Sequence, residues 1–431
     1  MNFKKYFIWS LLTGLLLVLS SFQISAEELA NKLGLADAEQ VALQRDLIMQ
    51  SQTASASAMA EKSVSADSWA DPVFKFGALA VPVDTYDLEQ EQMTQVVIGY
   101  KQMLPRGDSA ELKSKKWLSK AGLMEANKVQ RATMLKKMVR KAWLKVYLKE
   151  GARDIVKTNT SLFKQLVTVS RSQYVAGRKK QQDVLQAEVE LSLIEDKLEK
   201  VESELEVARA ALAKWVGDEK AQLPLDTETD FLADLMLTED QMSLNSLLQH
   251  PKVAQRDAMI DVAEKDVGLA SEKNSTQWGY DISYGVRQGD NPAGAGGGER
   301  PDFLSLMAVV SVPMFTSDKQ DRDIIASKQM LQAKKYQRQD TLRQLGSRLQ
   351  QVKARWYKSI ERINRYEERV LPQAKQNAKA AMSAYQSGVG SFIALTRARV
   401  SEFKAQLSHL KLIVEKANVL AEIRYLVGEE S

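Results

Sequence analysis

One stretch of this sequence occurs twice, and the repetition constrains the fold more than any other feature. The first copy reads Tyr174-Val-Ala-Gly177 and the second reads Tyr385-Gln-Ser-Gly388, and an alanine stands ten residues past each glycine. The tyrosine, the glycine and the alanine each recur after 211 residues. An internal repeat of this length predicts a duplicated architecture. We expect each copy to form two antiparallel helices joined by a tight glycine turn.

The amino terminus has the pattern of a cleaved export signal. Lys4 and Lys5 precede an apolar run from Tyr6 to Leu19, and small residues extend to Ala26. A positive start, an apolar centre and a small-residue exit are typical of a secretory signal. A membrane anchor is the alternative, but this run is shorter than the roughly 20 residues that a spanning helix needs. We therefore expect an exported protein.

Composition excludes several classes of function. The chain of 431 residues has no cysteine, which excludes a disulfide framework and a lipid attached through an amino-terminal cysteine. Its formal charge of +5 is too small to indicate binding to nucleic acid. The two histidines are His250, at a helix start, and His409, within a coiled seam, and both positions favour structural roles. Without clustered cysteine or imidazole ligands, we expect no metal site, no cofactor and no enzymatic activity.

Long helices dominate the predicted structure. No proline occurs from Ser109 to Ala176, which predicts a helix of roughly 100 Å that ends at Gly177. A return helix is expected over residues 181–216. Its apolar residues alternate in spacings of four and three, which predicts a left-handed coiled-coil seam. The seam comprises Ala187, Leu191, Ile194, Leu198, Val201, Leu205, Ala208, Leu212 and Trp215.

The second copy has the same order of helices. A long helix is expected over residues 318–388 with a kink at Pro372, and a last helix to about Leu426. The seam of the last helix comprises Val400, Phe403, Leu407, Leu410, Val414, Ala417 and Ala421. Alanine-rich helices are expected over residues 35–67 and 250–272. Basic clusters at helical spacing predict a solvated helix face. One such cluster comprises Lys136, Lys137, Arg140 and Lys141.

Two pairs of β-strands interrupt the helices. Alternating apolar and polar residues predict strands over residues 73–81, 94–104, 280–286 and 304–312. Each has about ten residues, the dimension of a strand that crosses a bilayer in a barrel, and a soluble sandwich is the alternative. Four strands cannot close a barrel, because the smallest membrane barrels have about eight. Two chains would supply eight strands and three would supply twelve, and only a larger count leaves an open lumen.

The repeat divides the chain into four predicted segments. Residues 1–26 are the signal peptide, 27–217 the first repeat, 218–249 an equatorial connector and 250–431 the second repeat. The predicted fold class is mainly α with a small β part. It consists of duplicated coiled-coil hairpins and four membrane strands per chain.

In its order of elements the chain resembles the TolC-like outer-membrane efflux proteins. Helix, strand hairpin, long helix, Tyr-x-x-Gly turn and helix occur in both copies, and the resemblance covers nearly the whole mature chain. Residues 70–72, 93–95 and 102–107 are similar to the branch often associated with heavy-metal efflux. The resemblance implies a homotrimer in bacterial outer-membrane lipid, with a twelve-stranded pore and a helical tunnel in the periplasm. A periplasmic adaptor and an inner-membrane pump would be its partners, and the pump would supply the energy.

The resemblance also implies that the hairpin turns form the tunnel tip, where they contact the adaptor and close the aperture. The corresponding residues here are Tyr174, Gly177, Arg178, Lys179, Lys180, Tyr385 and Gly388. The three basic residues either face the adaptor or are solvated. Aperture positions six and nine residues past each glycine are Asp183, Gln186, Ala394 and Arg397. The family often has acids at the last two, so an acidic ring is absent or altered. We hypothesise that Asp183 pairs with Arg397 to hold the tip closed.

Two other classes of protein remain open. A periplasmic adaptor would have one hairpin flanked by compact β domains. An exported coiled-coil structural protein would have no reason for the alternation in residues 280–286.

Overall fold

The computed structural model describes residues 32–227, 245–291 and 296–427. The predicted signal of residues 1–26 lies outside these ranges, as does part of the predicted connector. The described chain is mainly helical with one four-stranded antiparallel sheet, as predicted. It forms two compact units, and each unit takes residues from both predicted repeats. Among the described residues, no helix has the length and apolar character needed to cross a membrane.

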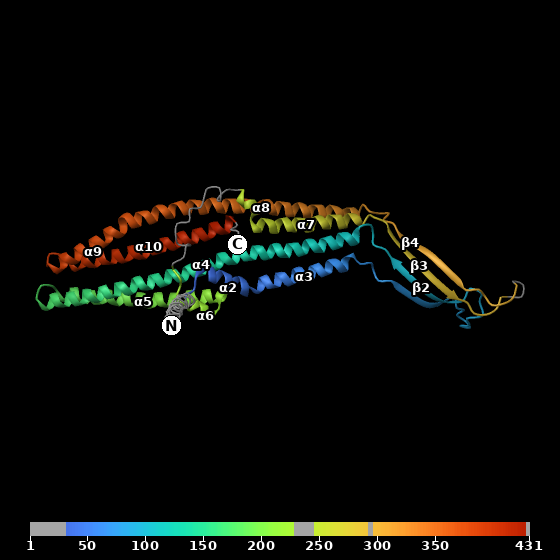
Figure 1. The fold of residues 1–431 in the computed structure, drawn as a ribbon, viewed down its shortest axis with the longest axis horizontal. Coiled ribbons are helices and arrows are strands. Elements are labelled where there is room, and N and C mark those ends of the chain that lie inside the picture. The colour runs from blue at the N-terminus through green and yellow to red at the C-terminus, as the bar shows by residue number, and fades with distance from the viewer. Residues whose placement is uncertain (1–31, 228–244, 292–295, 428–431) are drawn as a thin grey trace, which may run out of the picture. The chain divides into compact units, whose positions relative to one another are not determined.

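The first of these, which we call the sheet unit, comprises residues 50–129 and 251–341. Its strands pair in the order β1-β2-β3-β4 (Figure 1). The outer edges of β1 and β4 therefore have no partner strand within the described chain. The strands are β1 (Val73–Leu79), β2 (Gln95–Met103), β3 (Gln277–Val286) and β4 (Phe303–Ser311). The helices that contribute to this unit are α3 (Leu47–Asp67), α4 (Ser109–Val175), α7 (Pro251–Glu272) and α8 (Gln320–Arg365). The four predicted strand regions are confirmed.

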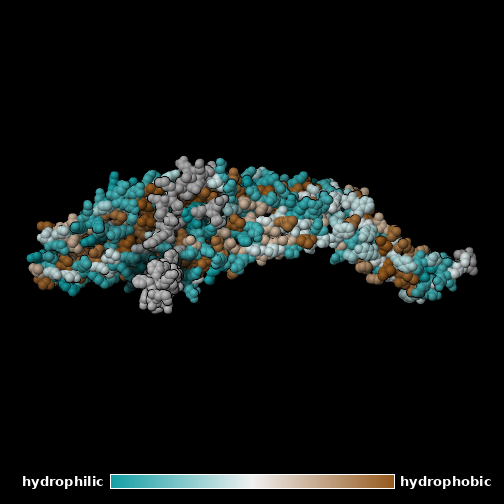
Figure 2. All heavy atoms as spheres, viewed as in Figure 1, coloured by the Kyte–Doolittle hydropathy of each residue, from teal (hydrophilic) through white to brown (hydrophobic). Residues whose placement is uncertain are grey.

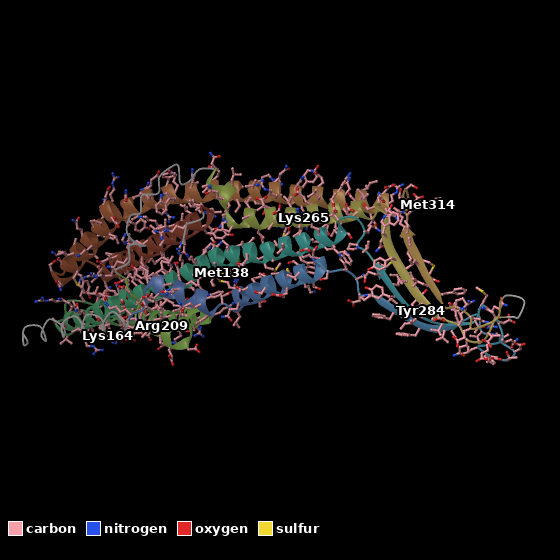
Figure 3. The ribbon with its side chains drawn as sticks, turned by 45° about the vertical axis from the view of Figure 1, so that its right-hand side comes forward. Met138, Lys164, Arg209, Lys265, Tyr284 and Met314 are labelled. Atoms are coloured by element: carbon pink, nitrogen blue, oxygen red, sulfur yellow. The ribbon has the colours of Figure 1, made fainter. Side chains whose placement is uncertain are left out.

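One face of the sheet is apolar and exposed. The strand register aligns Phe74 with Tyr100, Tyr100 with Ile282, and Ile282 with Leu306 across all four strands. Exposed residues of this face are Phe74, Phe76, Val96, Ile98, Trp278, Tyr280, Ile282, Tyr284, Val286, Leu304, Leu306 and Val310. Figure 2 shows apolar residues gathered over the strands, and Figure 3 labels Tyr284 among them. Alternation with period two places all of them on the same side.

The opposite face of the sheet is more polar and less exposed. Lys75 on β1 forms an ion pair with Asp281 on β3, although β2 lies between these strands. Gly99 on β2 is aligned with Lys75 and has no side chain, which leaves room for the lysine to cross. Asp281 is therefore buried with a charged partner rather than alone.

The second part, the hairpin unit, comprises residues 32–49, 130–250 and 342–427 within the described ranges. The ends of α4 and α8 belong to it. Its other elements are α2 (Leu35–Arg45), α5 (Gln181–Val216), α6 (Asp218–Ala221), a 3₁₀ turn (Ser246–Gln249), a π turn (Tyr366–Val370), α9 (Leu371–Gln386) and α10 (Phe392–Val427).

The predicted coiled seams form the core of this unit. Ala187, Ile194 and Val201 are buried in one cluster with Phe403, and Leu191 packs against them. Other predicted seam residues in or against this cluster are Leu198, Val400, Leu407 and Leu410. The seam prediction is wrong at its end, where Trp215 is only half-buried and Val216 takes the buried position.

The helix predicted over residues 35–67 breaks at Asp46, so a single helix is wrong. The backbone of Asp46 is extended, and its carboxylate accepts a hydrogen bond from the N–H of Met49 at 2.8 Å. This is an N-cap, which starts a new helix inside a run of good helix formers. Burial alone would raise the pKa of Asp46, but hydrogen bonds from Arg131 and the Met49 backbone hold it below its usual range.

A π turn over Tyr366–Val370 immediately precedes Pro372. A proline cannot donate the helical hydrogen bond and crowds the carbonyl four residues earlier, and a π turn absorbs this locally. The interruption predicted at Pro372 therefore takes the form of a π turn.

Acidic residues from distant helices neutralise a basic stretch of α4. Arg140 pairs with Glu39 at 2.6 Å, and Lys141 pairs with Glu422 at 3.1 Å. Glu422 is also 3.2 Å from Arg348 and 3.8 Å from Lys137. Burial alone would raise the pKa of Glu422, but these cations hold it below its usual range. The prediction of a solvated basic face is wrong for Arg140, which is buried.

Candidate functional site

The two glycine turns form the tips of the helical hairpins. Gly177 and Gly388 have φ of 72° and 87°, which an L residue adopts only with strain. After α4, the N–H of Arg178 bonds to the carbonyl of Gln173 at 3.0 Å, the six-to-one bond of a Schellman ending. After α9, the N–H of Gly390 bonds to the carbonyl of Ala384 at 2.8 Å.

Tyr385 lies at the centre of the paired tips and is fully buried. Its hydroxyl is 3.4 Å from Ser170 Oγ and 3.4 Å from Asp183 Oδ2, so it can donate to the carboxylate and accept from the serine. Its ring packs edge-on against Phe392 at 5.7 Å. Burial first, and then the neighbouring Asp183, raise the pKa of Tyr385, so its hydroxyl keeps its proton.

Lys179 connects the first tip to the second. Its ammonium donates hydrogen bonds to the carbonyls of Gly388 at 3.2 Å and Gly390 at 2.8 Å. The same nitrogen lies 5.1 Å from the centre of the Tyr385 ring. The three predicted basic tip residues therefore differ in their surroundings. Lys179 is hydrogen-bonded within the chain, whereas Arg178 and Lys180 are exposed.

The four predicted aperture residues do not form one cluster within a chain. Asp183 lies against Tyr385, and the described structure shows no ion pair from it to Arg397, so the hypothesised pair is not formed within one protomer. Arg397 instead lines a groove between α5 and α10 together with Gln186. Ala394 is exposed, and its backbone N–H donates a hydrogen bond to the capping hydroxyl of Ser391 at 3.2 Å.

Sequence reasoning missed Ser170 and Gly390. Ser170 is fully buried beside Tyr385, and the carbonyl of Gly390 accepts a hydrogen bond from the ammonium group of Lys179. Tyr174, the repeat equivalent of Tyr385, is 45% exposed rather than buried. The sequence pattern treats the two tyrosines alike, so only a comparison of their surroundings reveals the difference.

The histidines have packing contacts. His250 is buried, with Nε2 3.0 Å from the carbonyl of Tyr425 and its ring edge-on to that residue. His409 Nε2 is 3.0 Å from a carboxylate oxygen of Glu367. Among the residues that the structure describes, no group of three His, Cys, Asp or Glu side chains could hold a metal ion.

No sequence-family model and no curated protein matches the chain. Solved structures do match it. The outer membrane protein VceC of Vibrio cholerae is 16% identical with a TM-score of 0.75, and the match covers 91% of this chain and 96% of VceC. CusC, whose crystal structures concern conformational changes that accompany folding and transmembrane channel formation, is 14% identical with a TM-score of 0.75. The match covers 91% of both chains. The open-state MtrE outer membrane channel of Neisseria gonorrhoeae is 14% identical with a TM-score of 0.73, covering 91% of this chain and 88% of MtrE.

These similarities extend over nearly the whole length of each chain, although the identities are low. The described strands, long helices and paired turns all fall within an architecture that these proteins share. The chain therefore has the fold of these outer-membrane channel proteins.

Proposed function

We propose that this protein is the outer-membrane channel of a tripartite efflux system. It would be a passive exit duct and not an enzyme. The observation that carries the proposal is a sheet with one exposed apolar face and two unpaired edges, joined to duplicated helical hairpins. Neither a periplasmic adaptor nor a coiled-coil structural protein accounts for this sheet.

The apolar face suits contact with lipid. The strands β2, β3 and β4 have nine to ten residues, which at the tilt of a barrel match an apolar band of about 25 Å, whereas β1 has seven and is shorter. Trp278 lies near one end of β3 and Tyr284 near the other, and both are exposed. Membrane barrels have girdles of exposed aromatic residues at these two levels, where the lipid meets water. In water, twelve large exposed apolar side chains on one face would be an aggregation hazard.

The unpaired edges support closure by further copies of the chain. An open edge exposes backbone donors and acceptors that cannot remain unsatisfied in lipid. Pairing β4 of one chain with β1 of the next satisfies both edges, and three chains give a barrel of twelve strands with an open lumen. The helical hairpins of the trimer would form the periplasmic tunnel.

The tips are proposed to contact a periplasmic adaptor, through which an inner-membrane pump delivers the substrate. Val175 and Val389 at the two turns are 80% and 86% exposed, and Arg178 and Lys180 are exposed beside them. Such residues suit a partner with apolar and acidic side chains. Assignment to the heavy-metal branch stays a prediction, since the TM-scores to VceC and CusC are equal.

Membrane fractionation tests the proposal. We expect the protein in the outer-membrane fraction, as a trimer on an unheated gel and a monomer after heating. Reconstitution into a planar bilayer should give discrete conductance steps. A monomer in the periplasmic fraction would contradict the proposal and favour an exported coiled-coil protein.

Asp183→Ala is expected to raise the resting single-channel conductance, because it removes the carboxylate that faces Tyr385 across the paired tips. A hydrogen bond to a charged group contributes about 1.5–3 kcal/mol, and the 3.4 Å separation places this one at the weaker end, so the closed state should become roughly 10-fold less favoured per chain. Asp196→Ala replaces an exposed aspartate of the same helix and serves as the control. A closed state unchanged by Asp183→Ala would remove this residue from the proposed aperture.

A further inference from the structure

The polar face of the sheet carries every charged side chain of the four described strands. These side chains are Lys75 on β1, Lys101 on β2 and Asp281 on β3. The strand register aligns Lys101 with Asp281, and Lys75 lies two residues further toward the loop end of the sheet, opposite Gly99. At about 3.3 Å per residue, the three charges fall within roughly 7 Å along the strands. They form one level of the sheet, which we call the charged band.

Asp281 neutralises only one of the two lysines in this band. Its buried carboxylate forms an ion pair with Lys75, which crosses the strand between them over Gly99. Lys101 is the direct neighbour of Asp281 in the register, yet its side chain forms no ion pair within the part of the chain that the structure describes. Two lysines and one aspartate leave the charged band with a net charge of +1 in each chain.

In the proposed channel the charged band faces the lumen, because the apolar face of the same strands is turned toward lipid. The inference drawn from the band therefore rests on the proposed function. Three chains place their bands at one level of the barrel and produce a ring with a net charge of +3, one charge per chain. Rings of lysine or arginine are the arrangement by which anion pores select their ions.

Acidic side chains beyond the strands lie too far from the band to cancel its charge. The segment between β1 and β2 carries four of them, namely Asp84, Asp87, Glu89 and Glu91. Lys101 is six residues from Gln95, where β2 begins, and this separation is about 20 Å along the strand. The screening length in 0.1 M salt is about 10 Å, so the acids of this segment act on the loop end of the sheet and only weakly on the band.

We infer that the charged band makes the barrel part of the pore favour anions over cations, and that Lys101 is the residue that sets this preference. Twelve strands about 4.8 Å apart and tilted by about 40° close into a barrel with a radius of about 12 Å. Three unit charges at that distance from the axis favour an anion over a cation by about threefold in 0.1 M salt. Anionic solutes therefore pass the band faster than cationic solutes of the same size, and free metal cations are slowed.

The ion preference of the channel in a planar bilayer tests the inference. The measurement is the reversal potential in a KCl gradient around 0.1 M, which gives the permeability ratio of chloride to potassium. We expect a ratio of about three for the original protein, about one for Lys101→Gln and about one third for Lys101→Glu, because these changes set the net charge of the band to zero and to −1. Asp281→Asn leaves both lysines uncompensated and should raise the ratio to about nine.

Salt provides a second reading of the same ratio. In 1 M salt the screening length falls to about 3 Å, so the ratios of the original protein and of all these variants should converge toward one. A preference for chloride that persists at 1 M salt would come from direct contact in a narrow constriction and would overturn the assignment to the charged band.

Lys101→Arg is the matched control, because it keeps the charge at the same position and should leave the ratio unchanged. Each variant is first shown to form the heat-labile trimer, and if Lys101→Gln fails to assemble, Asp281→Asn decides by its opposite effect on the charge. A ratio that these charge changes leave unaltered overturns the inference, as does an original protein that favours potassium. A protein that forms no trimer and never conducts contradicts the proposed function itself.

Discussion

Leu306→Lys is expected to abolish the assembled channel, whereas Ser305→Lys is expected to leave it assembled. Leu306 lies near the middle of β4 on the apolar face and is 69% exposed. A lysine on the lipid face of a barrel costs about 2–4 kcal/mol at the bilayer midplane. Three copies in a trimer would raise this to about 6–12 kcal/mol, which is comparable with the whole stability of a typical domain.

The two substitutions are matched, because both place a lysine on the same strand, at neighbouring positions that point to opposite faces of the sheet. Ser305 is aligned with Ser283 on the polar face, where a lysine would meet water in the proposed lumen. The measurement is the fraction of heat-labile trimer in the outer membrane for each variant. Equal loss of trimer from both would contradict a lipid-facing side and support the alternative of a soluble sheet.

Patterns along the chain were enough to predict the regular elements. Period-two alternation located all four strands, and four-three spacing identified the residues of the seams. The glycines at positions 177 and 388 marked the turns, because only a residue without a side chain adopts their φ without strain. Each of these signals lies within a short stretch of the chain, so it can be recognised in a single sequence without knowledge of the tertiary contacts.

The errors arose where a local or distant partner overrides the pattern. Asp46 breaks a run of strong helix formers, because its side chain caps the following helix. Arg140 and Lys141 look like a solvated face, yet their acids stand 101 and 281 residues away in the chain. Spacing along a helix reveals which residues share a face, but it does not reveal which other helix meets that face.

The candidate site shows the same division. The turns and their tyrosines follow from the repeat, but the contacts of Lys179 join residues 209 and 211 positions apart. The hypothesised pairing of Asp183 with Arg397 used matched positions in the two copies and therefore assumed that the copies contact each other symmetrically. The contact within a chain is asymmetric, because only the first repeat carries the polar side chains.

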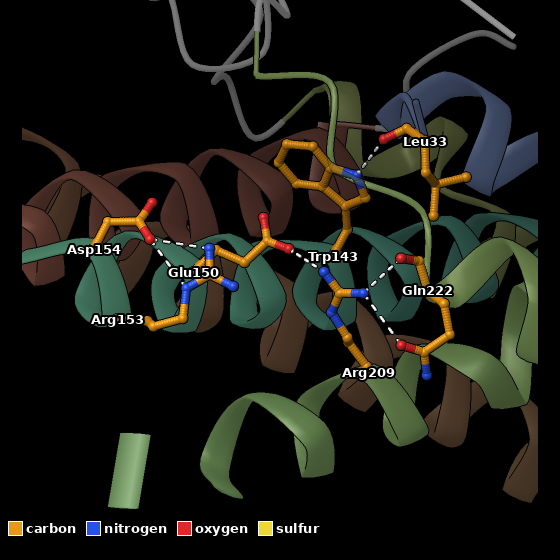
Figure 4. Close-up of polar contacts among 7 residues, drawn as sticks. All are labelled: Leu33, Trp143, Glu150, Arg153, Asp154, Arg209 and Gln222. Atoms are coloured by element: carbon orange, nitrogen blue, oxygen red, sulfur yellow. Dashed lines mark hydrogen bonds and ion pairs between the residues drawn. The ribbon is translucent and has the colours of Figure 1, made fainter. Parts of the chain in front are cut away.

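Trp143→Ala is expected to destabilise the hairpin unit by about 3–5 kcal/mol, the cost of removing a large aromatic side chain from a core. Trp143 is fully buried on α4. Its indole N–H donates to the carbonyl of Leu33 at 3.1 Å (Figure 4). Leu33 in turn is hydrogen-bonded to the segment after α6. Its backbone N–H donates to the carbonyl of Pro224, and its carbonyl accepts from the N–H of Asp226. The tryptophan thereby holds the start of the described chain against that segment.

Two further variants separate packing from hydrogen bonding at this site. Trp143→Phe keeps much of the buried volume but loses the hydrogen bond to Leu33, so it should cost about 1–3 kcal/mol. Trp215→Ala removes a half-buried tryptophan of α5 and should cost less than Trp143→Ala. The readouts are the heating temperature at which the trimer is lost and protease cleavage near Leu33. If the protease cleaves the Trp143→Ala variant near Leu33 no faster than the original protein, the tryptophan does not hold that segment. The effect of the substitution is then confined to packing within the hairpin unit.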